Sequence, residues 1–185
     1  MFIQTEATPN PATLKFLPGR PVLGDGTAEF RTRDEAGVSP LAERLFTIPN
    51  VSGVFFGDDF VTVSKSGGEW PHLKPAILGA IMEHFVSGAP LLRDVAPAST
   101  PTKEFFESAD SETVQTIKEL LDTRIRPAVA QDGGDITFQG YKDGVVYLHM
   151  RGSCAGCPSS TATLRHGIQN LLRHFIPEVR EVQSA

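Results

Sequence analysis

Hydrophobic and polar residues alternate over short runs in the first part of the chain, in the pattern of β-strands. Segments 2–6, 13–17 and 28–32 are rich in β-branched and aromatic residues and are bounded by turns that contain Pro or Gly. Segment 51–64 contains a strict alternation at its end and a Gly-Asp-Asp turn at 57–59, which predicts a hairpin.

Apolar residues at helical spacing follow these strands. Ser39 and Pro40 are a typical N-cap and first helical residue, and they predict a helix over 40–48. A second helix is expected to begin at Pro71 and to end before Gly88. Its apolar stripe recurs every four residues, at Leu73, Ile77, Ile81 and Phe85. The first part of the chain is therefore expected to be a small α+β domain.

Segment 93–109 loses this periodicity, and two prolines, Pro97 and Pro101, indicate a stiffened spacer. Phe105 and Phe106 indicate that the end of the spacer docks on one of the domains. The sequence thus predicts two small domains, residues 1–92 and 110–185, joined by a linker over 93–109.

The second domain is expected to begin with a helix capped by Asp110 or Ser111. The apolar face of this helix comprises Val114, Ile117, Leu120, Leu121 and Ile125. Pro127 removes a backbone donor, so the helix should kink there or restart toward Val129. The glycines of segment 131–135 should end it in a turn.

A hairpin and a long helix complete the second domain. Segments 136–141 and 145–150 predict two strands that turn at 142–144. A helix from Pro158 to the residues before Pro177 has the apolar positions Leu164, Ile168, Leu171, Leu172 and Phe175. Segment 178–182 can add a last strand. The fold class is α+β throughout, and the second domain is a helix–hairpin–helix–strand unit.

Length, charge and composition narrow the class of protein. The 185 residues are 40% hydrophobic and carry a formal net charge of −5, which argues against a general binder of nucleic acid or of anionic membranes. No apolar stretch approaches the ~18 residues of a membrane span. The first residues resemble neither an export signal nor an organelle presequence, which favours a bacterial cytoplasm. A mitochondrial matrix protein is the second expectation, if a presequence was removed.

The two cysteines of the chain, Cys154 and Cys157, are the main candidates for chemistry. They lie between a predicted strand and a predicted helix, among the small residues Gly152, Ser153, Ala155 and Gly156. The positive end of a helix dipole lowers thiol pKa, so we expect thiolates, the form that binds metal or attacks disulfides. In a reducing compartment such a pair is more often metal-binding or redox-active than structural.

Two thiolates are too few for a zinc ion or a four-thiolate cluster. His149 and His166 could complete a Cys₂His₂ zinc site, or a second copy of the chain could supply its own pair. His149 should share a strand face with Val145 and Tyr147. For both His149 and His166, an ordinary surface or packing role is favoured over metal binding. A thiol–disulfide oxidoreductase using Cys154 and Cys157 remains an alternative, although the expected frame is not thioredoxin-like.

The second domain resembles the NifU C-terminal, or Nfu-type, domain over roughly residues 110–182. The matching segments are 125–136, 144–168 and 176–179. The first domain is similar to the domain that usually precedes it in two-domain Nfu proteins, through segments 1–19 and 51–65. Together the two likenesses cover nearly the whole chain.

The resemblance implies an iron–sulfur cluster scaffold or carrier rather than an enzyme. Cys154 and Cys157 of two chains would hold one [4Fe-4S] cluster at a homodimer interface and pass it to apo iron–sulfur client proteins. An upstream cluster assembly scaffold would supply the cluster, and neither nucleic acid nor a membrane is expected as a partner. Gly152, Gly156 and Pro158 would shape the loop.

The segment from Asp132 to Asp135, Asp-Gly-Gly-Asp, also matches a family signature, but we expect it to be a turn first. We further expect the first domain to recognise clients or assembly partners, because its ligand-type residues are scattered.

Overall fold

The computed structural model describes residues 2–24, 26–93, 104–155 and 158–184, and for 158–160 it describes the backbone alone. It divides into two compact units, Met1–Ala98 and Ser99–Ala185. Each unit has its own hydrophobic core, and both mix helices with sheet, so the predicted α+β class is confirmed. The finer bounds of 1–92, 93–109 and 110–185 stay a prediction. Pro97 and Pro101 lie outside the described residues.

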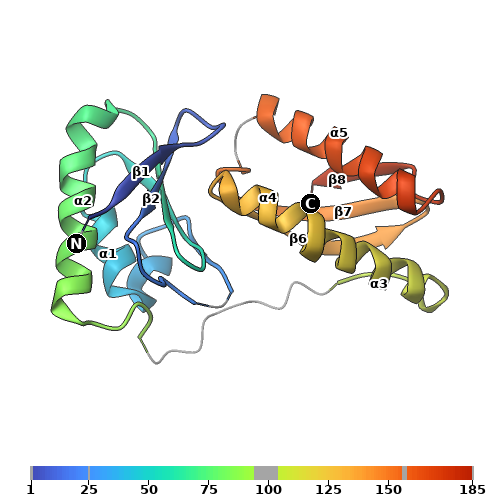
Figure 1. Ribbon diagram of the computed structural model, residues 1–185, viewed down its shortest axis with the longest axis horizontal. Coiled ribbons are helices and arrows are strands. Elements are labelled where there is room, and N and C mark those ends of the chain that lie inside the picture. Colours follow the sequence, from blue (N-terminus) through green and yellow to red (C-terminus); the bar gives the residue numbers. More distant parts are fainter. Residues whose placement is uncertain (1, 25, 94–103, 156–157, 185) are drawn as a thin grey trace. The chain divides into compact units, whose positions relative to one another are not determined.

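Unit 1 is built on an antiparallel five-stranded sheet of order β1-β2-β5-β4-β3 (Figure 1). Its strands are β1 (Gln4–Ala7), β2 (Thr13–Leu17), β3 (Ala28–Phe30), β4 (Val51–Phe56) and β5 (Val61–Lys65). The predicted strands are present, and the predicted hairpin is the β4–β5 pair.

Two helices, α1 (Pro40–Phe46) and α2 (Trp70–Ser87), form one core with the inward residues of this sheet. The predicted cap is confirmed, because the Ala42 N–H donates to Ser39 Oγ at 3.2 Å. Gly88 ends α2 in the left-handed conformation, with φ 70°. A short 3₁₀ turn, Glu35–Val38, precedes α1.

Unit 2 begins with a 3₁₀ turn (Ser108–Asp110), α3 (Ser111–Leu120), a π-helical turn (Leu121–Ile125) and α4 (Arg126–Gln131). The predicted interruption near Pro127 is therefore real, but it takes the form of a wide turn before the proline. The Arg126 N–H donates to the carbonyl of Leu121, five residues back. A π turn of this kind inserts a residue and redirects the helix, and Pro127 then sits in the first turn of α4, where its missing N–H costs little.

The sheet of unit 2 has the order β6-β7-β8. β6 (Gly134–Lys142) and β7 (Val145–Gly152) are antiparallel, and β8 (Glu181–Ser184) runs parallel to β7. The turn between β6 and β7 is tight, with φ of 52° at Asp143 and 79° at Gly144. This hairpin was predicted with shorter bounds, whereas the predicted last strand, 178–182, overlaps β8 only at residues 181–182.

The helices α3, α4 and α5 (Pro158–Phe175) pack with the inward residues of the three strands (Figure 1). Ile168 and Leu172 of α5 are buried as predicted. Phe175 is an exception, because 46% of it is exposed and its ring lies beside the Arg124 guanidinium instead. Leu172 and Ile176 on either side of it are both buried, so Phe175 lies at the margin of the core and not beyond its end.

The end of the predicted spacer docks on unit 2, as expected from its aromatic residues. The Phe105 N–H donates to the carbonyl of Gln139 at 3.2 Å, and the Tyr141 N–H donates to the carbonyl of Phe105 at 2.9 Å. The Phe105 ring lies 5.1 Å from that of Tyr147, and the Phe106 ring lies near Phe138. Segment 105–106 therefore extends the edge of the sheet at β6.

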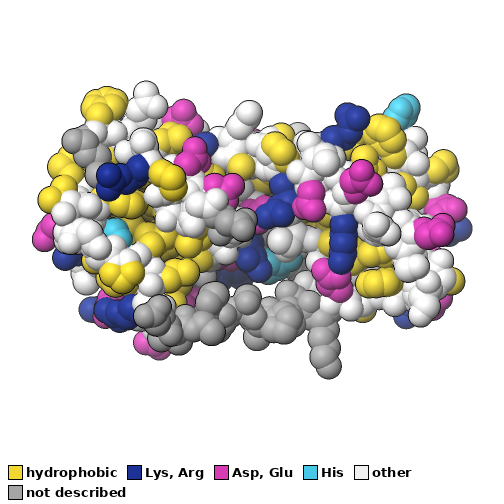
Figure 2. Space-filling model, turned by 60° about the horizontal axis from the view of Figure 1, so that its bottom comes forward, with side chains coloured by type: hydrophobic (Ala, Val, Ile, Leu, Met, Phe, Trp, Pro, Cys, Tyr) yellow, Lys and Arg dark blue, Asp and Glu magenta, His cyan; other side chains and the backbone are white. Residues whose placement is uncertain are grey.

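The described surface is of mixed charge. On the face drawn in Figure 2, basic and acidic side chains are interspersed and form no large patch of one sign. Within the described ranges, no helix has both the length and the apolar character that a bilayer crossing requires.

Candidate functional site

Cys154 lies just beyond the end of β7, in a turn that leads toward α5. Its side chain is 7% exposed and belongs to the core of unit 2. The carbonyl of Cys154 accepts a hydrogen bond from Thr161 Oγ1 at 2.9 Å, and the Ala155 N–H donates to the carbonyl of Gly152 at 3.1 Å. The end of β7 and the first turns of α5 therefore both hold this turn.

The residue before the cysteine ties this turn to the connection between α4 and β6. The Ser153 hydroxyl donates to the carbonyl of Asp132, and the Ser153 N–H donates to the carbonyl of Gly133 at 3.3 Å. Gly133 has φ 81°, a conformation that glycine adopts without strain. Ser153 is itself buried. The cysteine turn and the 132–133 turn thus form one hydrogen-bonded unit.

Gly134 approaches the sulfur more closely than any other residue type could. It pairs with Gly152 across the β6–β7 hairpin. A Cβ at position 134 would lie 2.7 Å from Sγ of Cys154 and 2.8 Å from the carbonyl oxygen of Arg151. The expectation that residues 132–135 form a turn is therefore only half right. Gly134 and Asp135 already belong to β6, because their backbone pairs with β7.

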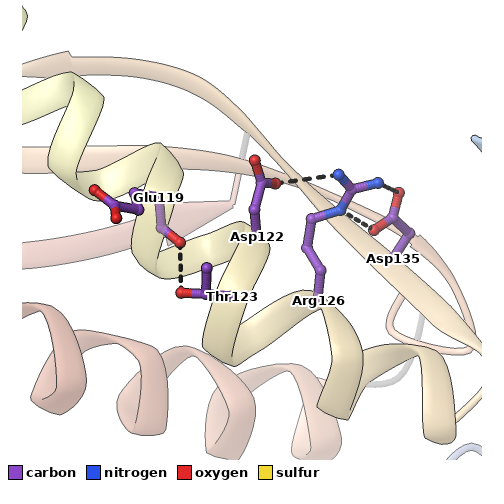
Figure 3. A network of polar contacts seen from close by, with 5 residues as sticks. All are labelled: Glu119, Asp122, Thr123, Arg126 and Asp135. Atoms are coloured by element: carbon purple, nitrogen blue, oxygen red, sulfur yellow. Dashed lines mark hydrogen bonds and ion pairs between the residues drawn. The ribbon is translucent and has the colours of Figure 1, made fainter.

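Asp135 is a buried residue, 3% exposed as a whole, and Arg126 binds both oxygens of its carboxylate with two guanidinium nitrogens (Figure 3). The Arg126 Nε to Oδ1 distance is 2.9 Å and the second arm reaches Oδ2 at 3.2 Å. The third nitrogen bonds Asp122 at 3.1 Å. Both carboxylates raise the pKa of the Arg126 guanidinium, and the hydrogen bonds that Arg126 donates to Asp135 contribute most. This network links the π-helical turn and α4 to the first residues of β6.

The predicted activation of the thiols is wrong for Cys154. Burial raises the pKa of its thiol to about 11, a hydrogen bond with Ser153 partly opposes this, and the charges of Asp132 and Asp135 raise it further. The side chain is buried in the core of unit 2, and desolvation is the largest cause of the raised pKa. Without metal, this thiol is protonated at neutral pH and is a poor nucleophile.

The structure describes only some of the other candidate site residues. Cys157 and Gly156 lie outside the described residues, as does the side chain of Pro158. His149 lies on β7 opposite Thr137, on the face that alternates with the buried residues, and His166 is exposed on α5. Across the described ranges, no three His, Cys, Asp or Glu side chains gather as a metal site would require. A Cys₂His₂ zinc site therefore finds no support here.

Arg126 and Thr161 were not identified from the sequence. A signal for Arg126 was present, because Asp135 falls within a strand whose neighbours are buried, and a buried carboxylate requires a cationic partner. Arg126 also lies four residues after Asp122, the spacing of a helical ion pair. The bond from Thr161 depends on how α5 meets the cysteine turn, which residue spacing does not specify.

Cys154 is the described residue that could act as a soft metal ligand. The donor is sulfur, which favours iron–sulfur clusters or zinc. Gly134 leaves no room for a side chain beside the sulfur. Fold and site together define a two-unit α+β protein with a buried cysteine in a turn lined by Gly134.

Comparisons with known proteins name the family. Residues 3–88 match the model of the scaffold protein Nfu/NifU N-terminal domain, and residues 117–183 match that of the NifU-like domain. A relative from Drosophila erecta, "NFU1 iron-sulfur cluster scaffold homolog, mitochondrial", is 56% identical over 100% of this chain and 65% of its own length. The human protein of the same name is 52% identical over 100% of this chain and 72% of its own length. The chain belongs to the Nfu family of iron–sulfur cluster scaffold proteins.

A solved structure, the NifU-like protein from Saccharomyces cerevisiae, is 29% identical and covers 50% of this chain and 85% of its own, with a TM-score of 0.46. The chain spans about 65% of the length of the Drosophila erecta relative. The names of the relatives correct the expected location, because they are mitochondrial and point to mitochondria rather than to a bacterial cytoplasm. The expectation relied on the first residues of a chain that matches only part of those proteins.

Proposed function

We propose that two copies of this chain bind one [4Fe-4S] cluster between them, each through Cys154 and Cys157, and transfer it to apo iron–sulfur proteins. The observation that carries the proposal is the surroundings of Cys154: its sulfur lies in a turn that is bonded to residues 132–133, with Gly134 leaving no side chain beside it. Family membership supports the identity of the cargo, since the relatives are named as iron–sulfur cluster scaffold proteins.

Transfer requires a site that both holds and releases its cargo. A cluster shared by two chains meets this requirement, because separation of the chains exposes it and thiolates of a client can replace Cys154 and Cys157 one at a time. Each incoming thiol gives up a proton as it becomes a ligand, and each departing cysteine takes one up. No covalent bond of an organic substrate changes, so we propose that the protein is a carrier and not an enzyme.

The source and the recipients of the cluster are other proteins in this proposal. An upstream assembly scaffold supplies the cluster, and apo iron–sulfur proteins receive it. The mixed surface charge of the drawn face offers no patch for nucleic acid. A thiol–disulfide oxidoreductase is not favoured, because the thiol of Cys154 is buried within the core of unit 2.

Anaerobic reconstitution with ferrous iron and sulfide tests the proposal. We expect a broad visible absorption band, about four irons per two chains for one [4Fe-4S] cluster, and a doubling of the mass in solution. Cys154→Ser and Cys157→Ser should each abolish the band and the dimer together. His149→Ala and His166→Ala are matched controls that should bind the cluster as the parent does. A parent chain that remains colourless and free of iron would refute the proposal, and zinc in the purified protein would favour a structural metal site.

A further inference from the structure

The position of the Cys154 sulfur depends on the backbone of residues 132–135. Ser153 is bonded to the carbonyls of Asp132 and Gly133, and Gly134 lies in close contact with Sγ of Cys154. Core packing is dense, so such contacts transmit displacements instead of absorbing them. Any shift of the 132–135 backbone is therefore passed on to the sulfur.

Asp135 holds the end of this segment, and Arg126 holds Asp135. The carboxylate side chain is 5% exposed and the guanidinium is 37% exposed, so the pair spans the boundary between core and surface. Two parallel N–H···O bonds, at 2.9 and 3.2 Å, fix the orientation of the carboxylate as well as its distance. Lysine, a point charge, could not fix that orientation.

A gain in folding stability alone does not explain why the chain contains the ion pair of Arg126 and Asp135. Replacing a buried ion pair by apolar residues is often neutral or stabilising, because desolvation offsets the attraction of the charges. The location of Arg126 suggests another use. It is the first residue of α4 and its N–H closes the π-helical turn on Leu121, and π turns are frequent at functional sites.

We propose that Arg126 is a positioning residue of the cysteine site. By binding both oxygens of Asp135 it fixes the 132–135 backbone, and through Gly134 and Ser153 it fixes the sulfur of Cys154 in the arrangement that a cluster requires. The cargo in this inference rests on the proposed function. The positioning itself is a property of the metal-free chain and is measured there first.

The first experiment uses the full chain carrying Cys157→Ser, so that Cys154 is the single thiol. The rate of its modification by a chromogenic aromatic disulfide is compared with and without the double change Arg126→Gln, Asp135→Asn. The double change leaves no unpaired charge in the core, so circular dichroism should show the parent fold. We expect the thiol to react about tenfold faster, because the local opening that exposes a buried group costs less free energy once its supporting contacts are lost.

Two controls separate positioning from general loosening. Asp122→Asn removes the exposed partner of the same guanidinium, and Ile117→Val trims the same core within α3. Both should leave the reactivity of Cys154 within about twofold of the parent, because neither change touches the contacts that govern local opening at the cysteine turn. Arg126→Lys keeps the charge without the two-armed geometry, so it should behave like the double variant.

The second experiment restores Cys157 and loads the cluster. Loss of the visible band to an iron chelator should be about tenfold faster in Arg126→Lys and in the double variant than in the parent or in Asp122→Asn. Unchanged thiol reactivity in folded Arg126→Lys and double variants would overturn the inference, whatever the cluster does. A parent chain that binds no cluster would instead refute the proposed function, and the thiol measurement would still decide the role of Arg126.

Discussion

Space, rather than backbone conformation, demands glycine at position 134. Its φ is not in the left-handed region, so alanine could adopt the same backbone. The added Cβ would nevertheless lie 2.7 Å from Sγ of Cys154 and 2.8 Å from a backbone oxygen, closer than real contacts allow. The sulfur, the strand or both would have to move.

Gly134→Ala is therefore expected to lower the free energy of unfolding of unit 2 by about 1–3 kcal/mol, as overpacking does, and to weaken cluster retention. Urea unfolding followed by circular dichroism measures the first effect, and release of iron to a chelator measures the second. Gly167→Ala in α5 is the matched control, because no atom lies within 4 Å of its added Cβ. That change should be neutral or stabilising by up to ~1 kcal/mol. Equal effects of the two substitutions would show that the close contact with Cys154 Sγ does not require glycine at position 134.

Some features of the residues around Cys154 could be predicted from the sequence, and others depend on tertiary contacts. The two cysteines and the glycine-rich signature could be recognised, because residue type and spacing carry that information. The pKa of the Cys154 thiol could not be predicted from the sequence, because it depends on how deeply the side chain is buried. The partner of Asp135 also depends on tertiary contacts across the α4–β6 connection.

At the scale of elements, the structure distinguishes two predicted helix caps. Ser39 is fully buried, and its Oγ accepts the Ala42 N–H. Asp110, before α3, makes no side-chain hydrogen bond of this kind. Both are favourable cap residues by type, so composition alone ranks them equally.

Ser39→Ala should therefore lower the free energy of unfolding of unit 1 by about 1 kcal/mol. Asp110→Ala should cost unit 2 about 0.5 kcal/mol or less, because only its interaction with the helix dipole is lost. Trp70 is the single tryptophan and lies in α2, so its fluorescence follows unit 1 during urea unfolding. Circular dichroism follows both units. A larger loss from Asp110→Ala would show that the cap geometry has been misassigned.

Most elements could be predicted because the alternation of the strands and the spacing of the helices are local patterns. The departures all involve neighbours in space. The π-helical turn lies where α3 must redirect before Pro127 while the apolar residues on both sides of it remain in one core. Phe175 satisfies the helical period, yet its ring lies at the margin of the core, beside the Arg124 guanidinium, while Ile176 after it is buried.

At the scale of the whole chain, the two hydrophobic cores are separate. The buried residues of the first core run from Ile3 to Ile81, and those of the second from Val114 to Val182. No described apolar residue belongs to both clusters, so each unit has the means to fold without the other. The cysteine turn and the pair of Arg126 and Asp135 belong to the second unit.

Deletion of residues 1–92 should therefore leave cluster binding intact while impairing delivery, if unit 1 recognises clients as we propose. Loss of one of two binding modules removes the gain in effective concentration that linkage provides, so transfer should slow by about tenfold or more. The measurement follows reactivation of an apo enzyme that requires a [4Fe-4S] cluster, with equal amounts of loaded full-length and shortened chains. The two should first show the same iron content and visible spectrum. Transfer at the parent rate to every client tested would mean that unit 1 serves the fold and not recognition.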